Sequence, residues 1–547
     1  MPPSLRGEEG THQATSNPAE MSGLPAGGWG VARAAGIIAL GNVASRVLGL
    51  VRETVIAHLF GATGLVSAFR VASILPTMLY DLLIGGMVSS ALVPVFSGYA
   101  AQEREELWRV ASLMLCLTAL VLSLVAVVLE FLAPQAAWLL SGGFDPELLA
   151  QTTKLMRITI PAVIFMSLSG VLTGLLYALK RFAYPAFTTA VFNAGMVSVA
   201  LLLAGKLGIA SLAVGLLAGA ALQVILQLPA LRDMRFLPSL DASHPGLRRL
   251  VRLYLPVVLG LVINQVGIAI DRNLASRTGA RSIAWMANAT TLIQFPLGLI
   301  SVAVSLAILP TLSREAANDE GQGRRGEFQA TLASGLRLVL VAIIPATIGL
   351  FILAHPIIAL LFEHGEFGPQ DTVQTALALR CYLIGLIFAA IDQPLVFAFY
   401  ARQDTLTPAL VGAAGVGIYL AVALALIRPL GMIGLVLANS LQLMGHALAM
   451  LALFWRRLGG LAGYGVGMAA TKALLASLAM GGATYLALGW VRGLSSTNGL
   501  AGELMAVGVP GGVGLMVYLA MLALLGAREA RMVWQRMWPF PRRMKDG

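Results

Sequence analysis

Long apolar runs separated by short polar connectors dominate this 547-residue chain. The runs recur along its length and reach about 20 residues, the length that an α-helix needs to cross a bilayer. Backbone N–H and C=O groups find no water inside lipid, so these runs must form helices that satisfy them internally. The pattern predicts an all-α polytopic membrane protein with about fourteen transmembrane helices. The expected spans are 31–59, 66–97, 108–132, 150–178, 184–204, 208–230, 251–275, 283–312, 332–353, 373–399, 406–426, 429–454, 465–490 and 504–525.

Composition supports this class. Hydrophobic residues make up 58% of the chain and charged residues 12%, whereas soluble proteins carry about 25% charged residues. The short alternating segments of a membrane β-barrel are absent from the sequence. Cys116 and Cys381 each lie inside an apolar run, so we interpret them as core residues and expect neither a disulfide nor a metal site.

The two ends of the chain differ from its middle. Residues 1–29 are polar and rich in Gly, Pro, Ser and Thr. They lack the basic start, apolar run and small-residue cleavage site of a secretory signal. We expect a disordered cytoplasmic tail there, and a basic cytoplasmic tail over 527–547.

The net charge of +11 has a topological explanation. With the N-terminus placed in the cytoplasm, segments on that side of the expected spans hold 23 Lys and Arg residues, and the opposite loops hold 5. Cytoplasmic loops of membrane proteins carry such an excess. We therefore expect an inner-membrane protein with both termini in the cytoplasm, and no nucleic-acid partner.

An internal repeat is visible in short strings at helix ends, at offsets of 223, 216 and 218 residues. It predicts an N-lobe over 30–232, a C-lobe over 245–457 and two extra helices over 464–526. Two such lobes enclose a central cavity and can rock about it, which gives alternating access. The alternative is that Pro and Gly simply recur at helix ends. The paired strings are Tyr177-Ala178 and Pro185-Ala186 with Tyr400-Ala401 and Pro408-Ala409, Leu92-Val93-Pro94 with Ile308-Leu309-Pro310, and Arg52-Glu53 and Gly61-Ala62 with Asp271-Arg272 and Gly279-Ala280.

Several ionisable residues fall inside apolar spans, where each costs at least about 2.5–3.5 kcal/mol unless it faces a cavity or a partner. The second span carries a polar stripe with Arg70, Thr77 and Asp81, and the tenth carries Arg380 and Asp392. We predict a mostly cationic cavity for an anionic head group, because the arginine fork binds two phosphate oxygens at once. The alternative is interhelical ion pairs or snorkelling arginines. The candidate substrate-binding residues are Arg46, Arg52, Glu53, Arg70, Asp81 and Arg272.

Proline and glycine inside two spans suggest a gate. Pro76, Gly85 and Gly86 lie in the second span and Pro296 in the eighth, and proline kinks a helix by removing a backbone hydrogen bond. A static kink is the alternative. The sequence shows no P-loop and no histidines at metal-ligand spacing, so we expect a transporter rather than an enzyme, with no cofactor.

The order of several motifs resembles the MurJ (MviN) family of lipid II flippases over residues 30–530. The motifs are Ser45-Arg46-Val47-Leu48-Gly49-Leu50-Val51-Arg52-Glu53 with Phe60-Gly61-Ala62, Leu75-Pro76, Arg181-Phe182 with Asn193, Asp271-Arg272, Phe295-Pro296-Leu297-Gly298, Leu309-Pro310-Thr311-Leu312-Ser313, Leu361-Phe362-Glu363-His364-Gly365 and Phe399-Tyr400-Ala401.

This resemblance implies the fold of the multidrug/oligosaccharidyl-lipid/polysaccharide exporters. It implies movement of undecaprenyl-pyrophosphate-linked peptidoglycan precursor from the inner to the outer leaflet of a bacterial cytoplasmic membrane. The family's first-helix cavity arginines correspond to Arg46 and Arg52. The last two helices would add a groove for the lipid tail.

The chain departs from the family at three cavity charges, where it has Ser67, Tyr80 and Thr291. Arg70 and Asp81 on the second span suggest that the charge has been redistributed within one cavity. Three other functions remain open: export of another polyprenyl-linked glycan, a non-transporting scaffold with the same fold, and a glycosyltransferase, which the short loops disfavour.

Coupling and partners are expectations at this stage. The membrane potential draws an anion toward the outside, and Na⁺ or H⁺ could reset the empty carrier through Asp271 and Asp404. We expect a monomer whose partners are lipid II or a similar glycan lipid, membrane lipids and cell-wall synthesis proteins.

Overall fold

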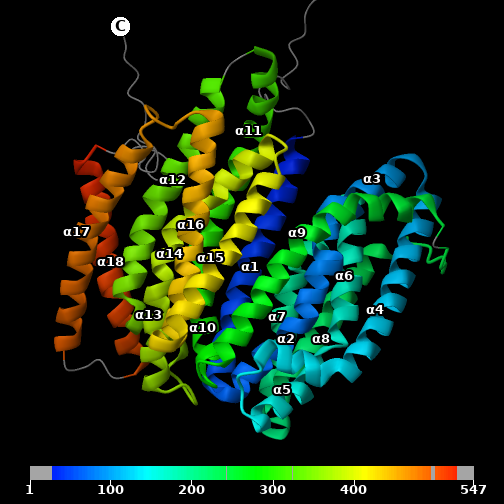
Figure 1. Ribbon diagram of the computed structural model, residues 1–547, viewed down its shortest axis with the longest axis horizontal. Coiled ribbons are helices and arrows are strands. Elements are labelled where there is room, and N and C mark those ends of the chain that lie inside the picture. Colours follow the sequence, from blue (N-terminus) through cyan, green and yellow to red (C-terminus); the bar gives the residue numbers. More distant parts are fainter. Residues whose placement is uncertain (1–27, 242, 323–324, 495–498, 527–547) are drawn as a thin grey trace, which may run out of the picture.

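The computed structural model describes residues 28–241, 243–322, 325–494 and 499–526, and every element in these ranges is a helix (Figure 1). The predicted all-α class is confirmed. The tail predicted over 1–29 lies almost wholly, and the tail over 527–547 wholly, outside the described residues. The first half contains α1 (Gly28–Phe60), α2 (Gly64–Tyr80), the π-helical η1 (Asp81–Gly85) and η2 (Val88–Leu92), α3 (Val93–Gln102), α4 (Arg104–Ser141), α5 (Pro146–Thr159), α6 (Ala162–Ala178), α7 (Ala183–Leu207), α8 (Ala210–Gln227) and the 3₁₀ turn η3 (Leu228–Leu231).

The second half repeats this order and adds two helices. It contains α9 (Pro245–Ser276), α10 (Ser282–Pro296), the π-helical η4 (Leu297–Val302), α11 (Ala303–Gln322), α12 (Arg325–Ile352), α13 (Ala354–Phe362), α14 (Pro369–Ala401), α15 (Leu406–Leu430), α16 (Met432–Leu458), α17 (Val466–Gly493) and α18 (Leu500–Leu524). In Figure 1, α17 and α18 stand at one edge of the molecule and α4 at the other. The added pair packs on α12 and α13.

Within the described ranges, 12 helices are long and apolar enough to span a membrane, or 13 if the bent α9 is one span. The expected count of fourteen is reached only if α1 is added. That helix has 33 residues, about 50 Å at 1.5 Å per residue, and it carries four charged residues, Arg33, Arg46, Arg52 and Glu53. A chain with so many spanning helices is a multi-pass membrane protein.

The repeat is visible in the backbone of the two halves. Helices α7 and α15 both have 25 residues, and each is closed by a glycine with positive φ, Gly208 at 55° and Gly431 at 56°. Just before these helices, Lys180 and Gln403 adopt φ values of 58° and 59°, a left-handed conformation that few non-glycine residues take. Both pairs are 223 residues apart, which supports two related lobes rather than a chance recurrence of Pro and Gly.

A π-helical segment interrupts the same span in each lobe. The segments η1 and η4 begin at Asp81 and Leu297, 216 residues apart. Pro76 lies inside α2, Gly85 and Gly86 end η1, and Pro296 directly precedes η4. Segments of this kind often mark functional sites. The gating role of these residues stays a prediction.

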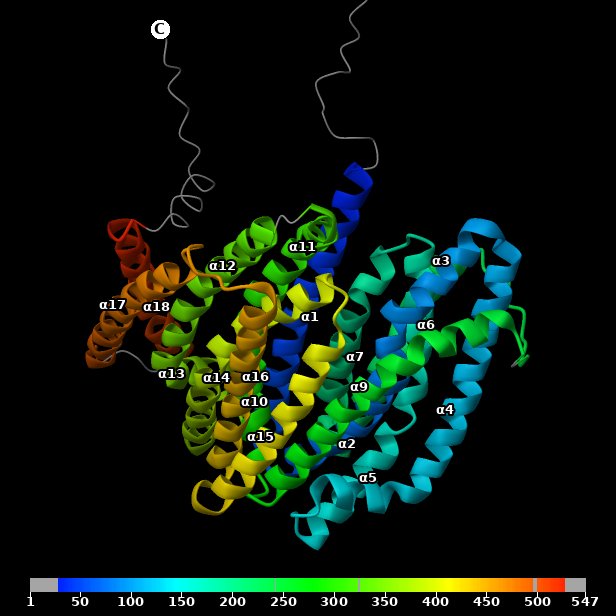
Figure 2. The same ribbon diagram turned by 45° about the horizontal axis from the view of Figure 1, so that its top comes forward.

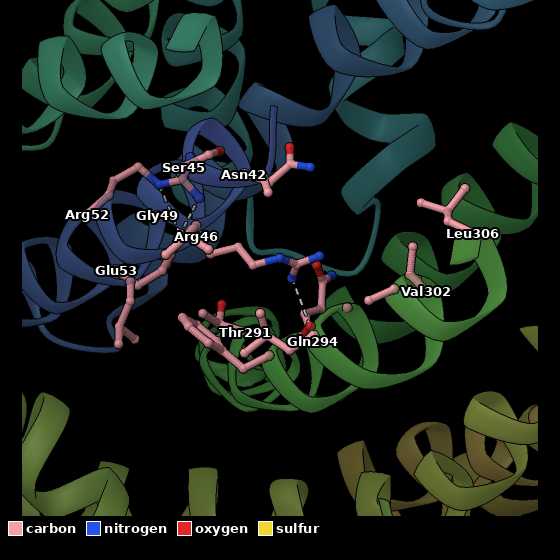
Figure 3. A pocket seen from close by; sticks show the side chains of 17 residues that line it. Asn42, Ser45, Arg46, Gly49, Arg52, Glu53, Thr291, Gln294, Val302 and Leu306 are labelled. Carbon is pink, nitrogen blue, oxygen red and sulfur yellow. Dashed lines mark hydrogen bonds and ion pairs between the residues drawn. The ribbon is translucent and has the colours of Figure 1, made fainter. Parts of the chain in front are cut away.

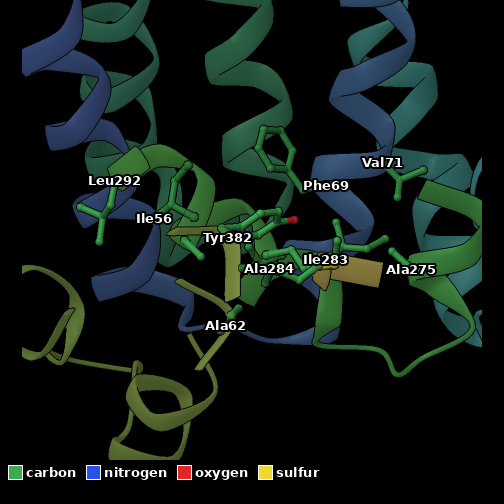
Figure 4. Packing of buried hydrophobic residues seen from close by; sticks show 14 of the residues in the cluster. Ile56, Ala62, Phe69, Val71, Ala275, Ile283, Ala284, Leu292 and Tyr382 are labelled. Carbon is green, nitrogen blue, oxygen red and sulfur yellow. The ribbon is translucent and has the colours of Figure 1, made fainter. Parts of the chain in front are cut away.

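The hydrophobic cores show where the lobes meet. One cluster draws side chains from both lobes, including Ile56 and Phe69 from the first and Ile283 and Tyr382 from the second (Figure 4). Toward the other end of the bundle each lobe has a core of its own. The lobes therefore join at one end and separate at the other, as the turned view also shows (Figure 2).

Backbone contacts seal the joined end. The Glu366 N–H donates to the His58 carbonyl over 3.0 Å. Gly61 and Gly365 permit this approach, because a Cβ on Gly61 would lie 2.5 Å from the Glu366 carbonyl oxygen and one on Gly365 would lie 2.2 Å from that of His58. Both glycines also have positive φ, so a larger residue is disfavoured twice.

Helix α9 links the lobes. It bends by 57° between Pro245–Leu255 and Gly260–Ser276. Its first half packs in the first-lobe core, where Leu250 is buried and the Tyr254 hydroxyl donates to the Leu82 carbonyl of η1. The stretch assigned by sequence to the start of the C-lobe therefore also touches the N-lobe.

Candidate functional site

A cavity of about 600 Å³ lies where the lobes separate, between α1 and the α10–η4–α11 span (Figure 3). Arg46, Arg52 and Glu53 line it from the first lobe. Thr291 and Gly298 are among the residues that line it from the second. The cavity thus contains the family-like first-helix arginines and one position of a missing family charge.

Arg46 crosses this cavity. Its Nη1 donates to the Gln294 carbonyl of α10 over 2.9 Å, and Figure 3 shows the side chain reaching from one lobe to the other. Gly298 makes room for the guanidinium, since a Cβ there would lie 1.9 Å from Arg46 Nη2. A guanidinium has five N–H donors, and this hydrogen bond uses one. Four remain available to an anion.

A buried carboxylate organises the other arginines. Glu53 is 2% exposed and its Oε1 accepts from Arg52 Nε and Nη2 over 3.1 and 2.6 Å. Its Oε2 accepts from Arg70 Nη2 over 2.5 Å. Asn193 of α7 accepts from Arg52 and Asn288 of α10 from Arg70, each over 2.9 Å. Four helices, including one from the second lobe, therefore hold the two guanidinium groups in place.

A second cavity, of about 420 Å³, lies inside the first lobe and shares Arg52 and Glu53 with the first. Arg70, Tyr80 and Asp81 line it as well. The structure thus brings together five of the six predicted substrate-binding residues around two adjoining cavities. The polar stripe predicted on the second span does face a cavity at these positions.

The charge balance suits an anion. Three arginines and one glutamate around the shared wall give a net charge of +2, and Asp81 lowers this to +1 if it is ionised. Glu53 is enclosed by arginines on both oxygens and would repel a phosphate, so we infer that it positions the arginines rather than contacting the substrate. Arg52 uses three of its five N–H donors, which leaves two for a ligand.

Three predicted residues lie elsewhere. Arg272 lines neither cavity. Asp271, near the end of α9, accepts from the Tyr419 hydroxyl over 2.6 Å. Asp404 follows α14 at the opposite end of the bundle and accepts from Thr407 and Arg457. The two aspartates therefore do not share one site, and the described residues include no group of three or more metal-type ligands.

Ser67 and Tyr80 occupy the other two positions at which the family has a cavity charge. Ser67 is fully buried, and its hydroxyl accepts from the Ala284 N–H of the second lobe over 3.2 Å. It belongs to the seal between the lobes rather than to a cavity. Tyr80 lines the first-lobe cavity beside Asp81, one helical turn beyond Pro76.

An ion pair stabilises the corresponding loop in each lobe, outside the membrane spans. The two repeat-related positions have opposite charges, an arginine in the first lobe and an aspartate in the second. Arg181 donates to Asp233 over 2.7 and 2.9 Å, and the repeat-related Asp404 accepts from Arg457 over 3.0 Å. The hydrogen bonds from Arg181 lower the pKa of Asp233. Burial would raise the pKa of Asp404, but hydrogen bonds from Thr407 and the charge of Arg457 outweigh it and lower that pKa.

Sequence reasoning did not select Asn288, Gly298 or the backbone of Gln294 as parts of the site. A polar Asn in an apolar span is a usable signal for the first. The other two act through backbone geometry, which residue type alone does not reveal.

Comparison with known proteins identifies the family to which this chain belongs. Residues 56–505 match the model of the family described as "Lipid II flippase MurJ". The chain is 31% identical over 512 residues to a "Probable lipid II flippase MurJ" of Vibrio cholerae, covering 90% of this chain and 95% of that one. It is 30% identical over 375 residues to a "Lipid II flippase MurJ" of Burkholderia cenocepacia, covering 66% and 72%.

Solved structures with the same fold include "Lipid II flippase MurJ, inward closed conformation", with a TM-score of 0.74 and 24% identity over 91% of this chain and 99% of that one. An inward-facing multidrug resistance MATE family transporter of the MOP superfamily follows, with a TM-score of 0.64 and 13% identity over 76% and 95%. Because both structures are less than 25% identical to this chain, they show its fold and not its function.

Proposed function

The chain belongs to the lipid II flippase MurJ family, and from this membership we infer that it is a lipid II flippase, a transporter and not a catalytic enzyme. The cargo is undecaprenyl-pyrophosphate-linked peptidoglycan precursor, carried from the inner to the outer leaflet. One observation carries the site assignment: Arg46, Arg52 and Glu53 line the cavity where the lobes separate, and Glu53 pairs with both Arg52 and Arg70. Arginine is the residue best suited to a pyrophosphate, because it stays charged and binds two oxygens together.

The shape supports alternating access. The lobes are sealed at the ends of α1 and α10 that carry His58 and Ala284, and open at the other end. The open end is the one at which Arg104 and Arg181 lie. Arginine-rich ends face the cytoplasm, so we assign this conformation as open to the cytoplasm, with both chain termini on that side of the inner membrane.

Arg70 supports the redistribution of cavity charge. It lies one turn from Ser67, and its guanidinium shares Glu53 with Arg52. A positive charge thus remains next to the cavity although Thr291 is neutral. This arrangement keeps a site for pyrophosphate, the group that lipid II shares with other polyprenyl-linked glycans, and the family match favours lipid II among them.

The driving force follows from charge. Each negative charge that moves outward gains about 2.3 kcal/mol per 100 mV of membrane potential, so the potential favours export of a pyrophosphate. Coupling to Na⁺ or H⁺ through Asp271 or Asp404 stays a prediction, and each residue would have to act separately. The lipid-tail groove at α17 and α18, a monomeric state and contacts with cell-wall synthesis proteins are proposals on the same footing.

Complementation tests the function. The chain would be expressed in bacteria depleted of their own lipid II flippase, beside Arg46→Ala, Arg52→Ala and the matched control Arg380→Ala. Arg380 is half-buried on α14 and lies over Phe351, and it lines neither cavity. We expect growth with the wild type and the control, and none with the cavity variants at equal expression.

Other outcomes would redirect the assignment. No rescue by correctly inserted wild type would point to another polyprenyl-linked glycan. Rescue by all variants, with loss only on removing the chain's tails, would point to a scaffold.

A further inference from the structure

A histidine–aspartate pair lies inside the second lobe, away from both cavities. His446 Nδ1 of α16 is 2.9 Å from Asp392 Oδ1 of α14. The two side chains are only 17% and 13% exposed. Ionisable groups in a membrane helix are costly and usually serve a proton, an ion or a substrate, and the anion site uses neither of these residues.

The backbone of α15 lies beside the same imidazole ring. Pro408 presents its backbone to His446, and because proline has no N–H, the group that it presents is the carbonyl oxygen. Gly412, one turn further along α15, lies beside Nε2, and a Cβ there would be in ordinary contact with it at 3.9 Å.

Two oxygen acceptors beside one imidazole favour an added proton. A neutral ring carries one N–H and one lone pair. With Asp392 ionised, a neutral ring would face either its carboxylate or the Pro408 carbonyl with a lone pair. One added proton, held on the ring or on the carboxyl group, satisfies both contacts.

The surrounding helices contribute few competing charges. The charge of Asp392 acts on Tyr400, further along α14, and residues 282–302 of α10 and η4 contain no ionisable side chain. Four ionisable side chains on neighbouring segments form hydrogen bonds with partners other than His446 and Asp392. They are Asp271 with Tyr419, Arg457 with Asp404, Arg314 with the Pro310 carbonyl, and Glu315 with Thr331.

A buried hydrogen bond joins this pair to the anion cavity. Pro394 lies two residues after Asp392 and has no N–H to give to the Ala390 carbonyl. The Ser301 hydroxyl of η4 donates to that carbonyl instead, over 2.6 Å. Ser301 shares the π-helical segment with Gly298, against which Arg46 lies. Movement of η4 against α14 would therefore change the surroundings of both Arg46 and the Asp392–His446 pair.

We propose that Asp392 and His446 form a proton-binding site whose occupation favours the cytoplasm-open conformation. The site adds proton linkage to the flippase and is distinct from its anion cavity. A proton that favours one conformation must bind more tightly in it. For one proton, the ratio of cytoplasm-open to outward-open protein rises at most about tenfold per unit of acidification.

The test follows the opening between the lobes without lipid II. Ser97 and Ser313 are exposed, repeat-related positions on α3 and α11. Spin labels on cysteines at these positions, with Cys116 and Cys381 replaced by Ala, report the separation by pulsed electron resonance. From pH 8 to pH 5.5 we expect the wild type to shift toward the long distance. His446→Gln and Asp392→Asn should remove the shift, and the matched control His355→Gln on α13 should keep it.

Either a pH-independent wild type or an unchanged pH response in His446→Gln overturns the proposal. If a variant fails to fold, exchange of the imidazole C2–H in the wild type, read by mass spectrometry, gives the answer directly. A protonation step at His446 between pH 5 and pH 9 supports the site, and its absence overturns it. Because these readouts need no substrate, they stay separate from the outcome of complementation.

Discussion

Removing the charge of Glu53 tests whether the arginine cavity depends on one buried carboxylate. Glu53 is 2% exposed and accepts three hydrogen bonds from Arg52 and Arg70. Breaking a buried pair by removing one partner costs about 3–5 kcal/mol. Arg52 is 29% exposed and can turn toward water, and glutamine keeps one acceptor. We therefore expect Glu53→Gln to lower the free energy of unfolding by about 2–3 kcal/mol.

Thermal unfolding of purified protein in detergent, followed by tryptophan fluorescence, measures this loss. A drop of about 2 °C is expected for a chain of this length. Glu147→Gln, at an exposed position at the start of α5, is the control and should change stability by less than about 0.5 kcal/mol.

A double variant makes the reasoning refutable. Arg70→Gln in the Glu53→Gln background removes the stranded cation, so the two losses should overlap by about 1–3 kcal/mol. Strict additivity, or a Glu53→Gln protein as stable as the wild type, would show that Glu53 does not hold the arginines.

Three further outcomes are expected. Gly298→Ala should displace the Arg46 guanidinium, because the new Cβ would lie 1.9 Å from Nη2; transport should fall several-fold while thermal stability changes by less than about 1 kcal/mol. Asp233→Asn should cost under about 1 kcal/mol, since the pair with Arg181 is solvent-exposed. As the folded pKa of Asp233 is lowered, the difference from the wild type should be full above about pH 4 and vanish as the pH falls through that folded pKa. Gly365→Val should open the seal, which cysteine accessibility from the periplasm would detect.

The helices and their grouping could be predicted from the sequence, because apolar length and recurring helix-end strings report directly on membrane crossing and on duplication. The paired positive φ values at Lys180 and Gln403 support the repeat. They could not be foreseen, since neither residue type favours that conformation. The expected count of fourteen includes α1, which carries charged residues within its apolar run.

The site was predictable only in part. Arginines inside an apolar span indicated an anion site, and Arg46 and Arg52 do line the cavity. The function of Glu53 depends on which side chains reach it, and sequence spacing does not give contacts between helices. Asp271 and Asp404 looked alike in sequence but lie at opposite ends of the bundle, each with its own partners. The pairing of His446 gives no signal in the sequence, because its aspartate lies 54 residues away on another helix.

Translocation of lipid II in proteoliposomes tests the central claim most directly. The fraction of a fluorescent lipid II analogue that becomes accessible on the far leaflet would be followed for the wild type, the Arg46→Ala/Arg52→Ala double variant and the Arg380→Ala control. We expect the wild type and the control to move the lipid, and the double variant to stay at the protein-free background while keeping its fold. Translocation by the double variant at the wild-type rate would contradict an arginine cavity as the route of the pyrophosphate.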